Sequence, residues 1–209
     1  TEEALIYYTL DGSEPTVRSQ RYTAPFILKN STLLKFIATK EGLLTSLTVA
    51  EKLNKLEFEE FHDYEGTAMT QGLKYRYYEN NVMFVGELSP LKPLETGTVS
   101  HFSIEDRKTD MYFGYEYNGF IRIPKDGAYT FFNKTNDGSI LYLDGEEFIN
   151  MDGGHPAHEV FKTIALKKGV YKIDQMYFQM GGGFMNKVSW KGPGFEKTEI
   201  PASVLIHSK

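Results

Sequence analysis

The sequence predicts an all-β protein built from two sandwiches, and three observations lead to this fold class. Short runs rich in Tyr, Phe, Val and Ile alternate with turn residues, and no convincing helical period interrupts them. The 209 residues include 14 Tyr, 15 Phe, 19 Gly and 8 Pro, which favours pleated surfaces joined by many turns. Asp-Gly pairs, which are typical of hairpin corners, begin at residues 11, 126, 137, 144 and 152.

The first 55 residues contain a series of short apolar runs that end at turn residues. This length is enough for a small fibronectin-like or immunoglobulin-like sandwich. We expect its strands at Ala4–Thr9, Phe26–Leu28, Leu33–Thr39 and Leu44–Ala50.

The segment YYTLDGSEPTVRSQRYTAPFIL, residues 7–28, carries a specific motif: a strand, an Asp-Gly turn, Ser-Glu-Pro-Thr, and then Tyr22 and Pro25-Phe26. It resembles the C-terminal fibronectin-like module of chitobiases and other β-N-acetylhexosaminidases. The resemblance implies one small domain over residues 1–55, in which Tyr22 and Phe26 fill the core. A complete module of this kind has one or two strands before Ala4, so we expect an unpaired sheet edge here.

Residues 56–72 form an acidic connector. They hold five Asp or Glu residues and no Lys or Arg, so the net charge of −5 belongs mostly to this segment. The run Glu51–Phe61 fits neither the helical nor the strand period, and both a short helix and a strand remain open. The sequences on either side carry no clustered positive face of the kind that nucleic acids need.

Residues 73–209 continue as strands and turns, which favours two antiparallel sheets packed face to face. The first strand is expected at Leu73–Tyr78, where side chains alternate, and residues 85–101 are expected to be a loop. The remaining strands are expected at Phe120–Ile123, Ala128–Phe132, Ser139–Asp144, Val160–Leu166 and Val170–Phe178.

Three segments of this second part carry a further resemblance: YTFFNKTNDGSILYLDG (129–145), GVYKIDQMYF (169–178) and SWKGPGFEKTEIPASVL (189–205). Together they resemble the protective-antigen module, a lectin-like β-sandwich that accompanies many secreted carbohydrate-active enzymes and adhesins. The resemblance covers residues 73–206. Trp190, the only Trp, lies at a strand end, and we expect it in the core rather than on a sugar-binding surface.

The chain offers few groups for catalysis. It has no Cys and no Gly-x-Ser-x-Gly motif. Acids such as Glu146 and Glu147 follow a turn, where charged residues are usually solvated, whereas a glycosidase needs two carboxyl groups facing each other across the sugar bond. His155 and His158 are too close for a helical zinc pair and have Pro156 between them. We therefore expect no catalytic residue here.

The turn TNDG, residues 135–138, is the main candidate for ligand binding. In sugar-binding members of the protective-antigen family, two adjacent Asp residues at this place, joined by a cis peptide, hold a calcium ion that in turn holds sugar hydroxyls. The resemblance places Asn136 and Asp137 there. Asn136 keeps an oxygen for calcium but removes one negative charge, and calcium affinity follows ligand charge. The alternative is a polar turn without metal, and no cofactor is required.

Two other loops, 150–158 and 179–186, are expected at the same end of the sandwich. Phe184 is expected either to offer an apolar face to a sugar ring or to reach into the core. The run Gly181–Gly183 is best explained by a tight chain reversal. The side chains expected to meet ligand hydroxyls, together with Asn136 and Asp137, are Asp152, Gln179 and Asn186.

These features predict the non-catalytic C-terminal accessory region of a bacterial glycoside hydrolase, a β-N-acetylhexosaminidase by resemblance. We expect its catalytic domain upstream, a secreted, periplasmic or outer-surface location, and a glycan as partner. Neither nucleic acid nor a membrane is expected to bind. The alternative is a pair of scaffold modules without a ligand, and a weaker one makes this chain itself a hydrolase.

Overall fold

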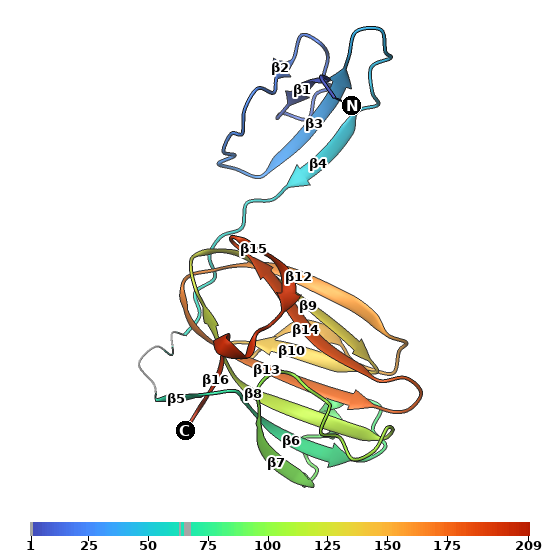
Figure 1. Cartoon of the computed structure of the whole chain (residues 1–209), viewed down its shortest axis with the longest axis vertical. Helices are drawn as coiled ribbons and strands as arrows, with labels where there is room; N and C mark the ends of the chain where they lie inside the picture. Colours follow the sequence, from blue (N-terminus) through green and yellow to red (C-terminus); the bar gives the residue numbers. More distant parts are fainter. Residues whose placement is uncertain (1, 63, 65–67) are drawn as a thin grey trace. The chain divides into compact units, whose positions relative to one another are not determined.

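The structure, a computed structural model, describes residues 2–62, 64 and 68–209. The chain divides into two compact units, Thr1–Glu57 and Phe58–Lys209. The described residues form strands and two short 3-10 helices, with no α-helix among them (Figure 1). The predicted all-β fold class is confirmed.

The first unit is one antiparallel sheet of four strands in the order β2-β1-β3-β4. Leu34 and Phe36 of β3 lie on the same face as Tyr8 of β1, because side chains two apart share a face and Tyr8 pairs with Phe36. This face is lined by apolar side chains around a hollow of about 210 Å³. The strands are β1 (Leu5–Thr9), β2 (Gln20–Arg21), β3 (Thr32–Thr39) and β4 (Val49–Leu53).

Two expectations for this unit are corrected. Phe26–Leu28 is irregular rather than a strand, although the Phe26 ring still stacks on Tyr8 with centroids 5.0 Å apart. The last strand begins at Val49 rather than Leu44, since only Val49–Leu53 pairs with β3. Tyr22 and Phe26 do contact each other, but both lie at the open face and stay more than 40% exposed.

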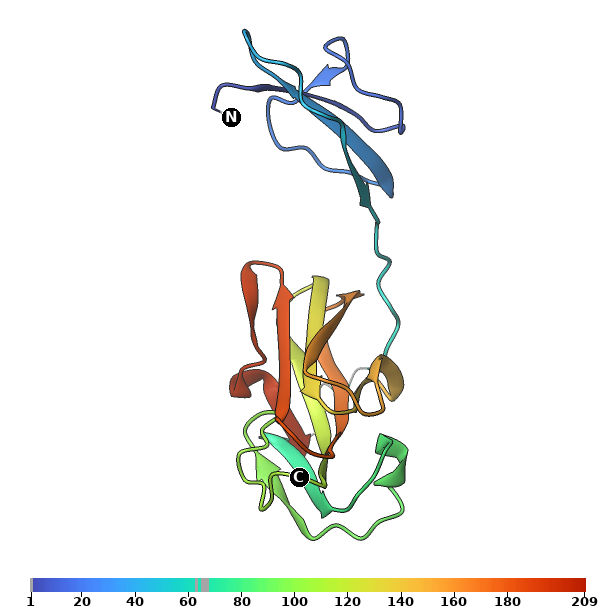
Figure 2. The same ribbon diagram turned by 90° about the vertical axis from the view of Figure 1, so that its right-hand side faces the viewer.

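The second unit consists of two sheets packed face to face (Figure 2). The smaller sheet has the order β12-β9-β14-β15 and the larger has the path β11-β10-β13-β8-β16-β5, with β6 and β7 added beside β8. The smaller sheet comprises β9 (Gly127–Asn136), β12 (His158–Leu166), β14 (Met185–Gly192) and β15 (Phe195–Glu199). The larger comprises β5 (Met69–Gln71), β6 (Leu73–Glu79), β7 (Glu95–Val99), β8 (Phe113–Ile123), β10 (Ser139–Leu143), β11 (Glu146–Met151), β13 (Gly169–Gln179) and β16 (Leu205–Ser208).

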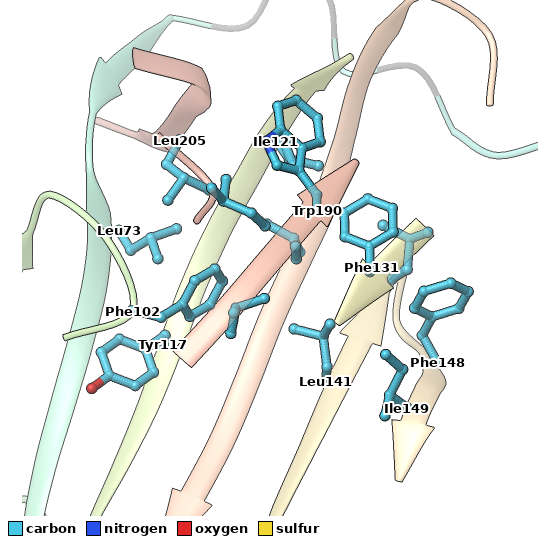
Figure 3. Packing of buried hydrophobic residues seen from close by; sticks show 14 of the residues in the cluster. Leu73, Phe102, Tyr117, Ile121, Phe131, Leu141, Phe148, Ile149, Trp190 and Leu205 are labelled. Carbon is cyan, nitrogen blue, oxygen red and sulfur yellow. The ribbon is translucent and has the colours of Figure 1, made fainter. Parts of the chain in front are cut away.

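The core between these sheets is rich in aromatic side chains from alternate strand positions (Figure 3). On β9, Tyr129 and Phe131 point inward, and on β14 Trp190 does the same. Trp190 is 3% exposed and stacks on Tyr129 with ring centroids 5.6 Å apart. Its predicted place in the core is confirmed, and burial of such rings supplies much of the stabilisation of the sandwich.

The Asp-Gly pairs do not all mark hairpin corners, as the sequence had suggested. Asp144-Gly145 does join the paired strands β10 and β11, with φ of 52° and 88°, as a two-residue hairpin turn requires. The pairs at 126, 137 and 152 instead lie where the chain passes from one sheet to the other. Here the turn residues serve as corners between layers.

The predicted loop 85–101 is also corrected. It contains a 3-10 helix, Val85–Glu87, and strand β7, Glu95–Val99, which pairs with β6. The strand sequence ETGTV is polar and contains Gly, so its local preference is weak. Pairing with β6 specifies it instead.

Candidate glycan site

The Asp137 carboxylate joins three loops at one end of the sandwich. Asp137 follows β9 and is linked to Asn136 by a cis peptide bond, as the family resemblance implied. Its Oδ2 accepts a hydrogen bond from the Met180 amide at 2.8 Å, and its Oδ1 accepts one from the His155 amide at 3.2 Å. The predicted meeting of loops 150–158 and 179–186 beside the TNDG turn is therefore observed.

Glycines allow the neighbouring turns to come this close. A β-carbon at Gly138 would lie 2.8 Å from the backbone nitrogen and oxygen of Gly153 and 2.4 Å from the Phe178 ring. The turns 137–138 and 152–153 therefore touch backbone to backbone. The Gly138 carbonyl accepts a hydrogen bond from the Phe178 amide at 2.9 Å, which fixes the turn on β13.

Gln179 fixes the conformation of the loop 179–186 through hydrogen bonds to the loop backbone. It is buried, and its Nε2 donates to the carbonyls of Gly181 at 3.0 Å and Gly183 at 3.1 Å. Gly182 has a φ of 83°, so the predicted tight reversal is confirmed. The expectation that Gln179 meets ligand hydroxyls disagrees with this burial, because its amide nitrogen is already committed to the loop backbone.

Tyr177 connects Gln179 to the Asn136 carbonyl. Its hydroxyl lies 2.7 Å from the Asn136 oxygen and 3.0 Å from Gln179 Oε1. Burial, with a further contribution from the Asp137 charge, raises the pKa of the Tyr177 hydroxyl well above its ordinary value. The hydroxyl therefore stays protonated at physiological pH and can donate a hydrogen bond.

Asn186 and Asp152 also hold the framework. Asn186 forms a reciprocal amide pair with Gln175, with N···O distances of 2.8 and 3.0 Å. The Asp152 Oδ1 accepts hydrogen bonds from the amides of Val85 and Gly153, both at 2.9 Å, and so attaches the 3-10 helix Val85–Glu87 to the same end. Both side chains are only partly exposed. The hydrogen bonds above leave each of them few free donor or acceptor positions for a ligand.

A buried polar network beneath the loops was missed by the sequence reasoning. Gln175 donates to Asn133 at 3.0 Å, Asn133 donates to Ser139 at 2.9 Å, and Thr135 lies 3.1 Å from Ser139. All four residues are buried. The signal was present in β9, where Asn133 and Thr135 continue the inward phase of Tyr129 and Phe131, because satisfied polar groups inside a core are typical of a specified site.

Three exposed aromatic rings lie on or beside these loops and provide accessible apolar surface there. The Phe84 ring faces Gly153 and is 54% exposed, Tyr112 is 45% exposed and Phe184 is 39% exposed. Tyr112 is fixed by its amide, which donates to the Met180 carbonyl at 3.0 Å. The Arg107 guanidinium lies 3.5 Å from the centroid of the Phe184 ring.

Asn136 and Asp137 as calcium ligands stay a prediction, and this corner offers calcium a single carboxylate. Calcium takes six to eight oxygen ligands and favours several carboxylates, whereas Asp137 brings one carboxylate whose two oxygens each accept a backbone amide. Among residues 2–62, 64 and 68–209, no three His, Asp or Glu side chains gather as a metal site. Asn136 therefore completes a hydrogen-bonded corner in this geometry.

Comparison with known proteins supports both resemblances. Residues 70–203 match the model of the PA14 domain, which is well over half of the chain. The chain belongs to the PA14 family. Residues 1–51 match the model of the chitobiase/beta-hexosaminidase C-terminal domain, so the order of the two modules is as the sequence motifs predicted.

One curated relative and two solved structures are similar to this PA14 chain over most of its length. A beta-hexosaminidase from Porphyromonas gingivalis is 27% identical, covering 81% of this chain and 22% of the relative. An anti-sigma factor domain-containing protein from Clostridium clariflavum has a TM-score of 0.58 and 22% identity, covering 85% of this chain and 61% of its own. Epithelial adhesin 9 A domain from Candida glabrata, in complex with Galb1-3GlcNAc, has a TM-score of 0.56 and 12% identity, covering 74% of this chain and 97% of its own.

The chain thus spans about a fifth of the length of the curated relative it matches. The two solved structures show a shared fold. Within the described residues, no helix has the length and apolar character needed to cross a bilayer.

Proposed function

We propose that this chain is the non-catalytic accessory region of a bacterial glycoside hydrolase, a β-N-acetylhexosaminidase, and that its PA14 module binds neutral glycans at the loop end. Two observations carry the proposal: this chain has a chitobiase/beta-hexosaminidase C-terminal domain followed by a PA14 domain, and 81% of it aligns with a beta-hexosaminidase. A bound module would keep the catalytic domain of the parent enzyme near its substrate, because tethering makes the second encounter intramolecular. Such an enzyme acts on external polysaccharide, so we place it in the periplasm, on the outer surface or in the secreted fraction.

In this proposal the residues of the loop end have two roles. Asn136, Asp137, Asp152, Gln179 and Asn186 position the loops through the hydrogen bonds described above. The exposed rings of Phe84, Tyr112 and Phe184 contact the glycan, because the C–H faces of a pyranose pack on aromatic rings while its hydroxyls stay hydrated. Backbone groups and the remaining free lone pairs of the partly exposed Asn136, Asp152 and Asn186 orient those hydroxyls.

Isothermal titration of the whole chain with the chitin tetrasaccharide tests this proposal. We expect binding that weakens about fivefold in Phe84→Ala, as loss of one stacking contact predicts. Leu44→Ala is the matched control, since Leu44 is an exposed apolar residue in the first unit. Chelation of divalent ions is expected to leave affinity and Tm unchanged.

The result that contradicts the proposal is the absence of heat with the chitin tetrasaccharide and across a broad array of neutral glycans. A rise in Tm on adding calcium would contradict its metal-free form. The second candidate function, a scaffold without ligand, is favoured by one observation: the Asp137 and Gln179 side chains are already satisfied within the protein. The scaffold hypothesis predicts no binding of the chitin tetrasaccharide and no binding of the other neutral glycans.

A further inference from the structure

The outer face of the small sheet β12-β9-β14-β15 carries a second feature, on the side opposite to the core (Figure 1). A hollow of about 280 Å³ opens on this face. Its lining is polar and charged, and it is made entirely by strand residues rather than by the loops of the candidate glycan site. The lining residues are Lys134, Glu159, Lys187, Ser189, Lys197, Thr198 and Glu199.

Lys134 is the cation without a partner in this hollow. It stands opposite Glu159 on β12 and opposite Lys187 on β14. Glu159, however, pairs with Lys197 at 2.5 Å, and Lys187 pairs with Glu199 at 3.3 Å. Within the described residues, the Lys134 ammonium has neither an ion pair nor a hydrogen bond.

Lys134 and Lys187 place two positive charges directly opposite each other on adjacent strands. Like charges directly opposite each other on adjacent strands destabilise a sheet, and this pair lies side by side in a chain whose net charge is −5. A bound anion would offset the repulsion. The hollow as a whole holds three Lys and two Glu residues, so it keeps a positive excess for an anion.

Ser189 adds a neutral polar group to this hollow. Its residue is 3% exposed, it lines the hollow, and its hydroxyl has no hydrogen-bond partner among the described residues. The hydroxyl is therefore free to bond to a ligand oxygen that enters the hollow.

An aromatic surface borders the same hollow. Phe161 follows Glu159 by two residues on β12 and so shares its face; it is 64% exposed and packs against Phe132 with centroids 5.7 Å apart. Lys197 lies over Phe132, 4.1 Å from the ring centroid. A sugar ring seated on Phe161 would bring its substituents toward the hollow.

We propose that the outer face of the small sheet binds an acidic saccharide, with its carboxylate or sulfate on Lys134 and Lys187, an oxygen on Ser189, and its ring against Phe161. The paired acids Glu159 and Glu199 accept hydrogen bonds from the sugar hydroxyls. This ligand class differs from the neutral glycan assigned to the loop end. The two sites lie on different surfaces of one sandwich.

The test is calorimetric titration of the whole chain with three probes. They are a tetrasaccharide of alternating glucuronate and N-acetylglucosamine, the neutral chitin tetrasaccharide, and sodium sulfate. We expect the acidic tetrasaccharide to bind, with affinity lost in 1 M salt because screening is then nearly complete. Lys134→Gln is expected to weaken it about tenfold, as loss of a charged hydrogen bond predicts, and Ser189→Ala is expected to weaken it less.

Controls separate this site from the loop end and from a fold defect. Lys52→Gln, an exposed lysine of β4, is expected to leave affinity for the acidic tetrasaccharide unchanged, and Lys134→Gln is expected to leave affinity for the neutral chitin tetrasaccharide unchanged. Tm of Lys134→Gln is expected to hold or rise, because a like-charge contact is removed; if it falls, Lys134→Arg, which keeps the charge, must bind normally. The proposal is overturned by no binding, by equal affinity in Lys134→Gln and the parent chain, or by sulfate binding as tightly as the tetrasaccharide.

Discussion

At the scale of single residues, Asp137 shows how one side chain can hold two loops together. Its two oxygens hold the amides of Met180 and His155, so one buried charge fixes two loops that are far apart in sequence. The motif TNDG identified the place. It did not identify the role, because a local pattern cannot show which distant amides fill the lone pairs of a carboxylate.

Asp137→Asn tests this role. One amide oxygen can still accept a hydrogen bond, but the NH₂ group then faces a backbone N–H, and a donor is left unpaired. We expect a loss of about 1–3 kcal/mol in the free energy of unfolding, measured by urea denaturation, and faster hydrogen exchange at the Met180 and His155 amides. Asp106→Asn, the same change at an exposed acid, is the matched control.

Equal stability of Asp137→Asn and the parent chain would contradict the proposed role of Asp137 in holding the loops.

Gln179 is a second residue whose role depends on the fold and not on the local sequence. Its polarity and loop position suggested ligand contact, whereas its burial makes it an internal brace. Burial of a polar residue depends on the whole sheet and is not visible in a stretch of ten residues.

At the scale of elements, the sequence pattern located most of β12 and β13, whereas only the end of β8, Phe120–Ile123, was predicted. Strands β9, β12 and β13 begin and end within a few residues of the predicted runs, because alternating aromatic and polar residues have only one good arrangement on a half-buried sheet. Strand β7 was missed because pairing with β6 specifies it. Asp-Gly corners likewise indicate a reversal but not whether the next strand stays in the same sheet.

Gly138→Ala tests the contact between the two corners beside the candidate glycan site. A β-carbon would meet Gly153 backbone atoms at 2.8 Å, which cannot move without displacing the 152–158 loop. We expect a loss of about 1–3 kcal/mol in unfolding free energy, typical of overpacking, together with weaker glycan binding. The comparison variant is Gly181→Ala, where no atom lies within 4 Å.

The Gly181→Ala protein should unfold at the same urea concentration as the parent chain. If Gly138→Ala were equally harmless, the close approach of the two corners would not be needed for the fold. Circular dichroism of both variants shows whether the sandwich itself survives.

At the scale of the whole molecule, the sandwich core is built around tyrosines whose ionisation is suppressed. Burial is the main cause that raises the pKa of Tyr78 to about 12, and burial also raises the pKa of the Tyr115 hydroxyl. Tyr75 has a pKa of about 12, chiefly because its hydroxyl donates to Glu95 at 2.5 Å. The second unit therefore favours the protonated form of these groups.

The sign of the resulting pH dependence follows from linkage. A raised pKa in the folded state means that the unfolded chain loses its tyrosine protons first, near pH 10, so the stabilisation is complete below that pH and is lost as pH rises toward 12. We expect Tm to fall over this window, with tyrosinate absorbance appearing together with unfolding. Tyrosinate absorbance that rises fully near pH 10 in a still-folded protein would contradict the stated burial.

Module order carries the functional conclusion at this scale. Each module alone is found beside many activities, while the chitobiase-type module followed by PA14 matches a beta-hexosaminidase over most of this chain. The sequence motifs predicted both modules and the candidate loop end. The proposed glycan contacts depend on exposed rings, such as Phe84 and Tyr112, that lie outside every motif.

The most direct measurement is an NMR titration of the isotope-labelled chain with the chitin tetrasaccharide. Binding at the loop end predicts saturable shifts of the Phe84, Tyr112 and Phe184 ring signals and of the amides of residues 152–158 and 180–186, with the strands β1 to β4 unaffected. Unchanged spectra at saturating sugar, or shifts confined to residues outside these loops, would contradict the account.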